Sequence, residues 1–255
     1  MAVVALASAS GSPGVTTTAL GLALLWPRPV LLVEADPTGG SGLLAGYFRG
    51  TREYDAGLIE LALTASNLSE ALADVARPIE GTTVSFVAGT RSHTQASALR
   101  DLWAPLAEVL SELETTGQDV IVDAGRLGLN GSPEPLLDAA DLALLVSRTT
   151  LPHLSALRSW AVAFQRPSLD WHQSAVMLIG ESQPYNARDV TAAVNLPVLA
   201  ALPDDPESAA VFSRGARPAK KFETGPLARA LTAAIAAIHS TITRRRNELL
   251  EGAPS

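Results

Sequence analysis

A glycine- and serine-rich turn at residues 10–18 follows the first apolar run of the chain and spells S-G-S-P-G-V-T-T-T. A phosphate-binding loop occupies this place between a first strand and a first helix. Its backbone N–H groups, a lysine and a hydroxyl hold phosphates and magnesium. Here Val15 precedes Thr16, and the chain's two lysines, Lys220 and Lys221, lie far downstream. The turn therefore predicts a loop shaped for phosphate that has lost its main cation.

Two carboxylates accompany this loop. Asp36 comes just after the apolar run 30–34, and Asp123 ends the apolar run 120–123. In open α/β sheets, ligands bind outside the carboxyl ends of the strands. We therefore expect both aspartates to share one rim of the sheet with the loop.

The elements that must position these residues alternate along the chain. Short apolar runs typical of parallel strands covered on both faces lie at residues 3–7, 30–34, 83–88, 120–123, 142–147, 175–179 and 198–201. Helical patterns lie at residues 16–25, 55–63, 68–76, 96–115, 154–165 and 187–194. This order predicts an α/β fold with a doubly wound, mainly parallel sheet of seven or eight strands and helices on both faces. We expect one domain over residues 1–225, followed by a C-terminal helix and tail over residues 226–255.

Composition narrows the class of protein. The chain has 255 residues, of which 47% are apolar and 18% charged, so it can bury a sizeable core. Cysteine is absent, which excludes thiolate metal sites and cysteine nucleophiles. No apolar run approaches the roughly 18 residues of a membrane span, and we interpret residues 2–7 as a buried strand rather than a signal peptide. These features predict a cytoplasmic protein.

Basic residues concentrate near the end of the chain. The net charge is −7, yet the segment 214–246 carries eight Lys or Arg against one acid, Glu223. This asymmetry indicates either an anionic partner or a solvated helix end with arginines near its C-terminal dipole. The candidate residues for an anionic partner are Arg214, Arg217, Lys220, Lys221, Arg244, Arg245 and Arg246.

Three segments together resemble the deviant-Walker P-loop ATPases of the ParA/MinD group. Residues 11–23 resemble that family's K-G-G-x-G-K-T-T-T-A-x-x-L-A, residues 30–40 its V-L-L-I-D-x-D-P-Q-G-G, and residues 119–125 its Walker B strand. The following run, 140–146, resembles the next core strand of the family. The resemblance spans about residues 1–215 and implies the same P-loop fold.

The resemblance assigns roles residue by residue. Thr16 matches the magnesium-binding hydroxyl, Asp123 the Walker B acid behind the magnesium, and Asp36 the carboxylate that positions the attacking water. The loop residues that would contact an ATP or ADP cofactor with magnesium are Gly11, Ser12, Gly14, Val15, Thr16 and Thr17.

Departures from the family pattern weaken this expectation. Ser10 and Val15 stand where the family has its two lysines, and Gly180-Glu181-Ser182-Gln183 stands where it often has an asparagine for the adenine. Loss of one charge-assisted phosphate contact costs about 1.5–3 kcal/mol of binding. Phosphoryl transfer should suffer more, because its catalysis is mostly positioning and charge stabilisation.

The resemblance therefore predicts a degenerate ParA/MinD-like protein with weak or absent ATPase activity. It would be a regulatory or scaffolding factor in intracellular positioning, partitioning, or secretion and pilus assembly. Its expected partner is a second copy or a related competent ATPase.

Two alternatives stay open. One is a working ATP-dependent dimerisation switch that borrows a cation from Arg126, Arg148 or Arg214. The other is a nucleotide-independent module that binds DNA nonspecifically through the basic segment. The pattern after residue 226 gives poor support for membrane insertion, because it lacks bulky aromatics and ends with Glu248 and Glu251.

Overall fold

The apolar runs of the sequence assemble into a single sheet in the computed structural model, which describes residues 2–11, 13–64, 67–113, 117–164 and 174–251. Over these residues the sheet has eight strands in the order β3-β4-β2-β5-β1-β6-β7-β8, and only the β3–β4 pair is antiparallel. The strands are β1 (Val3–Ser8), β2 (Val30–Glu34), β3 (Arg77–Pro78), β4 (Val84–Val87), β5 (Asp119–Arg126), β6 (Leu142–Arg148), β7 (Ser174–Ile179) and β8 (Val198–Leu202).

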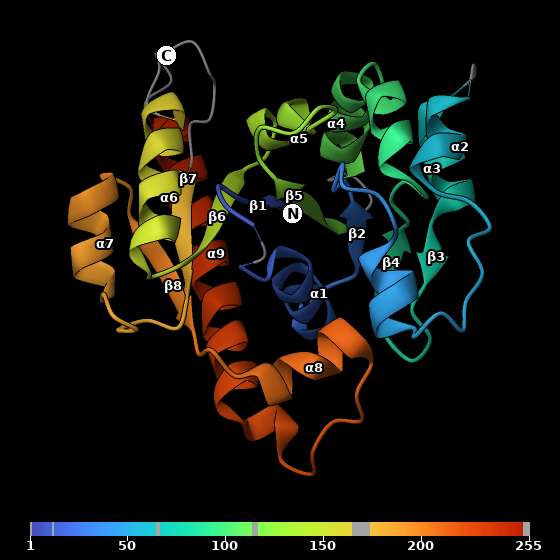
Figure 1. Cartoon of the computed structure of the whole chain (residues 1–255). Helices are drawn as coiled ribbons and strands as arrows, with labels where there is room; N and C mark the ends of the chain where they lie inside the picture. Colours follow the sequence, from blue (N-terminus) through green and yellow to red (C-terminus); the bar gives the residue numbers. More distant parts are fainter. Residues whose placement is uncertain (1, 12, 65–66, 114–116, 165–173, 252–255) are drawn as a thin grey trace.

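Helices connect the strands and cover both faces of the sheet (Figure 1). The α-helices are α1 (Val15–Leu25), α2 (Leu58–Ala62), α3 (Leu68–Val75), α4 (Trp103–Glu112), α5 (Glu134–Asp138), α6 (Leu151–Phe164), α7 (Ala187–Val194), α8 (Pro206–Arg214) and α9 (Pro226–Glu251). A π-helical turn spans Leu43–Tyr47, and 3₁₀ turns span His93–Leu99 and Phe222–Thr224.

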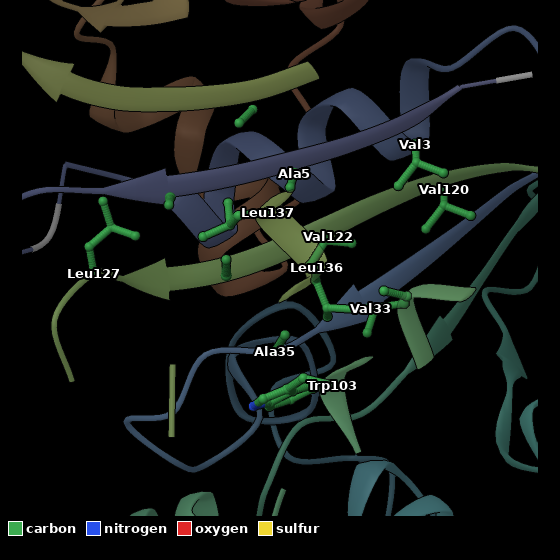
Figure 2. Close-up of a cluster of buried hydrophobic side chains, with 14 of the residues drawn as sticks. Val3, Ala5, Val33, Ala35, Trp103, Val120, Val122, Leu127, Leu136 and Leu137 are labelled. Atoms are coloured by element: carbon green, nitrogen blue, oxygen red, sulfur yellow. The ribbon is translucent and has the colours of Figure 1, made fainter. Parts of the chain in front are cut away.

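Each face of the sheet has its own apolar core, because successive side chains of a strand point to opposite faces. One core packs helices α2 to α7 against residues such as Val33 and Val122, and it includes the buried Trp103 (Figure 2). The other core packs α1, α8 and α9 against residues such as Leu6 and Leu32. Helices α4 and α5 accordingly lie on the opposite side of the sheet from α1 and α8 (Figure 1).

The predicted fold class is confirmed, and all seven predicted strands are present. The eighth strand, β3, was not predicted, since its two residues Arg77 and Pro78 carry no apolar pattern. The single helix predicted over residues 96–115 is wrong, because a 3₁₀ turn ends at Leu99 and α4 begins only at Trp103. The end of that prediction, residues 114–115, lies outside the described residues.

The longest helix, α9, follows the predicted C-terminal helix closely. Its buried side chains, among them Leu231, Ile235 and Ile238, belong to the same core as α1. Arg246 near its end forms an ion pair with Asp141 at 2.9 Å, and the Asp141 carboxylate also accepts the backbone N–H of Val3. Helix α9 is thus fixed to the sheet beside the amino ends of β1 and β6.

Candidate functional site

The loop after β1 leads directly into α1. Gly14 has φ 105°, a left-handed conformation that favours glycine, and it caps the helix without a side-chain hydrogen bond. A Cβ added at Gly11 or Gly14 would meet no atom within 4 Å, so this backbone is open on its outer side. The first backbone N–H groups of a helix attract anions. Ser12, the remaining loop residue of the expected site, lies outside the described residues.

Val15, the first residue of α1, is buried. Its side chain is only 6% exposed and belongs to the apolar core that α1 shares with α8 and α9. An aliphatic side chain held in that core offers no charge to a phosphate. At the position where the family has a lysine, this chain therefore has an apolar residue that contributes to the core.

Thr16 and Asp123 come together beneath the loop. The Thr16 hydroxyl donates a hydrogen bond to the Asp123 carboxylate, and the Gly125 N–H donates to Asp123 Oδ1 at 3.1 Å. Asp123 is 1% exposed. The pKa of Asp123 is raised to about 7, first by burial and then by the nearby charges of Asp36 and Glu34, while the two hydrogen bonds oppose the rise.

Asp36 lies beside Asp123 on the neighbouring strand connection. Its Oδ1 accepts the Thr38 N–H at 2.9 Å, while Ala35 N–H donates to the Asp123 carbonyl at 2.8 Å. Gly125 permits this approach: a Cβ there would stand 2.2 Å from Asp36 Cγ. The rim of the sheet therefore brings Thr16, Asp36 and Asp123 together, as the sequence predicts.

Glu34 is a further carboxylate that the sequence reasoning missed as a site residue. It is 4% exposed at the end of β2 and accepts hydrogen bonds from the Ser41 hydroxyl, from Leu43 N–H at 2.9 Å and from Gly89 N–H at 3.4 Å. Burial raises its pKa, and these hydrogen bonds oppose the rise. Glu34 thus ties the segment after Asp36 to the end of β4. The one available signal was an acid inside an otherwise apolar strand.

A cavity of about 400 Å³ opens beside the loop. Gly14 and Thr17 line one part of it, and the polar pair Arg148 and Asp204 lines another. Apolar walls come from β7, β8, α8 and α9 through residues such as Phe212. The volume falls in the range of about 300–1,000 Å³ that small-molecule sites occupy.

The three arginines considered as substitute cations lie differently. Arg148 and Arg214 line the cavity, whereas Arg126 is an exposed residue at the end of β5. Arg148 already pairs with Asp204, its Nη1 lying 2.6 Å from Oδ2 and its Nη2 3.2 Å from Oδ1. Its charge is therefore engaged in the structure.

The basic residues of the C-terminal segment do not form one cluster. Arg214, Arg217, Lys220 and Lys221 precede α9, while Arg244, Arg245 and Arg246 lie in its last turns. At 1.5 Å per residue, the two groups are separated by roughly 25–30 Å along the helix. Arg246 is held by Asp141, and Arg244 borders a separate cavity at the start of β6 and β8.

Magnesium fits this site only together with a phosphate. The ion prefers oxygen ligands and usually keeps waters and substrate phosphates in its shell. The Thr16 hydroxyl and the buried Asp123 carboxylate are ligands of this kind. Over the residues that the structure describes, no group of three or more His, Cys, Asp or Glu could hold a metal by itself. In the same residues, no helix is long and apolar enough to cross a membrane.

The fold is that of the MinD/ParA P-loop NTPases. MinD from Pyrococcus horikoshii, in complex with Mg-ADP, superposes with a TM-score of 0.71 and 19% identity over 93% of this chain and 95% of that one. MinD of Pyrococcus furiosus gives a TM-score of 0.73 at 18% identity, covering 94% and 98% of the two chains.

The structure of McdA resembles this chain to about the same degree as the two MinD structures. The ATP complex of a single-residue variant of McdA from Cyanothece has a TM-score of 0.69 and 18% identity over 94% of this chain and 96% of that one. No family model and no curated protein sequence matches the chain. At these identities the likeness establishes the fold and leaves the activity to be argued from the site.

Proposed function

We propose that the protein is a ParA/MinD-like factor in intracellular positioning, partitioning, or secretion and pilus assembly. It has a degenerate phosphate loop and serves as a regulator or scaffold with weak or absent ATPase activity. One observation carries the proposal: Val15 is buried in the apolar core at the start of α1, while Thr16, Asp36 and Asp123 still converge on the rim.

Each retained residue has a part in nucleotide binding. The open backbone around Gly14 and the start of α1 accept the phosphates of a nucleoside di- or triphosphate. Thr16 and Asp123 would hold a magnesium ion, which would neutralise phosphate charge, and Asp36 would orient the attacking water. Because the loop offers no lysine to stabilise the developing negative charge, hydrolysis is slow.

The expected partner is a second copy of this chain or a related ATPase. A supporting feature is Leu151, a large apolar side chain 64% exposed at the start of α6, directly after the strand that ends at Arg148. Among the proteins of this fold, MinD of Aquifex aeolicus has been captured in a MinC:MinD complex. We place the protein in the cytoplasm.

A hydrolysis assay with a dimerisation assay tests the proposal. We expect the purified protein with ATP, GTP and Mg²⁺ to release phosphate far more slowly than a lysine-bearing relative measured in parallel. Sedimentation would follow self-association with and without nucleotide. Phosphate release at the relative's rate would refute the idea of a degenerate factor.

A dimerisation switch with a borrowed cation is the second candidate. The observation in its favour is that Arg148 and Arg214 line the same cavity as the loop. This candidate predicts nucleotide-dependent dimerisation that Thr16→Ala or Asp36→Ala abolishes. Unchanged nucleotide affinity in both variants would exclude it.

Nonspecific DNA binding is the third candidate, and exposed Arg244 at the far end of α9 keeps it open. It predicts salt-sensitive retention on DNA that is lost when Arg244, Arg245 and Arg246 are neutralised together. Failure to retain the wild-type protein on DNA at low salt would dismiss it.

A further inference from the structure

An ion pair forms part of the wall of the cavity beside the phosphate loop. Arg148 ends β6 and Asp204 follows β8, so the pair bridges two strands that flank β7. The two side chains are 36% and 28% exposed, and both guanidinium Nη atoms contact the carboxylate, one oxygen each. The Asp204 carboxylate therefore accepts a bidentate pair of hydrogen bonds, one on each oxygen.

The end of β7 lies beside Asp204. Gly180 has φ 71°, and a Cβ added there would lie 3.2 Å from Asp204 Cβ. The buried Thr149 hydroxyl donates to the Gly180 carbonyl at 3.1 Å and so joins the ends of β6 and β7. Gly180 thus leaves room for Asp204 in this part of the cavity wall.

The cavity connects Asp204 with the loop. Its lining includes Pro13, Gly14 and Thr17 at the start of α1, and apolar side chains such as Ile179 and Phe212 beside the ion pair. A ligand that fills the cavity can place an anion at the start of α1 and a flat apolar ring near Asp204. A nucleotide has this combination of parts.

The chemistry of the ion pair favours one base. An ionised carboxylate only accepts hydrogen bonds, and the guanidinium meets it with two parallel N–H groups. Guanine carries the same arrangement on one edge, its N1–H beside its 2-amino group. Adenine presents an acceptor, N1, beside its 6-amino group, so one carboxylate oxygen would face a lone pair.

We propose that the cavity binds a guanine nucleotide, with Asp204 accepting the N1–H and the 2-amino group of the base in place of the Arg148 guanidinium. This inference rests on the proposed function, since it identifies the nucleotide of the same site. The exchange breaks a two-point ion pair, but both side chains are partly exposed, so water offsets part of the cost of separating them. The base gives Asp204 two hydrogen bonds in place of the two from Arg148, whose partly exposed guanidinium is then hydrated.

Calorimetric titration with GDP, IDP and ADP, each with Mg²⁺, tests the selectivity. We expect GDP to bind about tenfold or more tightly than ADP, because a site built to hydrogen-bond a ligand discriminates against an analogue that leaves its polar groups unpaired. IDP keeps the N1–H and lacks the 2-amino group, so it should bind with intermediate affinity. ADP binding as tightly as GDP, or no binding of any of the three, would overturn the proposal.

Asp204→Asn gives a sharper test. The amide still accepts the N1–H but now donates toward position 2, where xanthine carries a carbonyl oxygen. We expect the variant to prefer xanthosine diphosphate over GDP, a reversal that a misfolded protein could not show. The control is Asp205→Asn, which removes the same charge one residue later. Asp205 Oδ1 accepts the Ser208 N–H at the start of α8, a role that asparagine also fills, so the preference for GDP should persist.

Arg148→Gln keeps the test decisive if Asp204→Asn does not fold. Removing the resting partner leaves Asp204 free for the base, so the preference for GDP over ADP should remain. Loss of that preference in Arg148→Gln would contradict the exchange. The outcome is separable from the proposed function: a protein that prefers ADP yet hydrolyses nucleotide slowly would disprove guanine recognition alone.

Discussion

Restoring the missing cation is the most direct test of how the phosphate loop has changed. In Val15→Lys, the new ammonium adds one charge-assisted phosphate contact, worth about 1.5–3 kcal/mol. At 1.4 kcal/mol per factor of ten, this predicts nucleotide binding tighter by about 10- to 100-fold. Because Val15 is 6% exposed in the apolar core, its loss should cost about 1–2 kcal/mol of folding stability, moderated by a lysine stem that can lie along the core surface.

Val15→Lys should raise the nucleotide affinity but lower the folding stability, so a general change in stability cannot be mistaken for the effect on binding. Calorimetric titration of GDP and ADP with Mg²⁺ gives the affinity, and urea denaturation without nucleotide gives the free energy of unfolding. Val15→Met is the matched control, since it supplies a flexible apolar stem without a charge and should leave the affinity unchanged. If the lysine and methionine variants bind nucleotide equally, position 15 does not face the phosphates and the central reasoning is refuted.

Two further predictions concern the carboxylates of the rim. Gly125→Ala should destabilise the fold by about 2 kcal/mol or more, because φ is 61° and the new Cβ would stand 2.2 Å from Asp36 Cγ. Gly50→Ala, with φ 66° and no atom within 4 Å of the new Cβ, reports the conformational cost alone, and equal urea midpoint shifts for both would contradict the clash. Glu34→Gln should gain stability relative to wild type as the pH rises from about 5 to 8. Burial raises the folded-state pKa of Glu34 above its ordinary 4.5, so the native state binds more protons than the unfolded state in this window, and wild-type stability falls with increasing pH. Urea unfolding at both pH values measures this, and a constant difference between the two proteins would show that Glu34 is not shifted.

The sequence was sufficient for most of the fold, because its signals were local. Buried parallel strands appear as short apolar runs, and those ending near Glu34 and Asp123 were placed correctly. Helix α8 was not predicted, since it is short and only two of its side chains, Ala210 and Phe212, are buried. Its start was nevertheless marked by Asp205 as an N-cap and Pro206 in the first turn.

The residues of the candidate site likewise fall into those that the sequence could predict and those that it could not. The loop, Thr16, Asp36 and Asp123 follow from strand ends that share one edge, so the sequence could predict that they meet. The pairing of Arg148 with Asp204 could not be predicted, because 56 residues separate them and their contact depends on the order β6-β7-β8. Glu34 could not be predicted for another reason: the donors that satisfy its buried carboxylate come from Ser41, Leu43 and Gly89, which no spacing rule connects.

These two kinds of residue have different consequences for function. Residues predictable from sequence belong to the phosphate end, where the fold dictates positions and where Ser10 and Val15 stand in place of the family's two lysines. The structure adds Asp204 and its pairing with Arg148 at the proposed base end, where strand order brings distant loops together. A loop that holds phosphate weakly leaves more of the binding free energy to the base. Selectivity in this protein should therefore depend more on Asp204 than on the loop. Val15→Lys should accordingly strengthen GDP and ADP binding by the same factor and leave their ratio unchanged. A ratio that collapses when the lysine is added would show that the two ends are coupled and that Asp204 does not act alone.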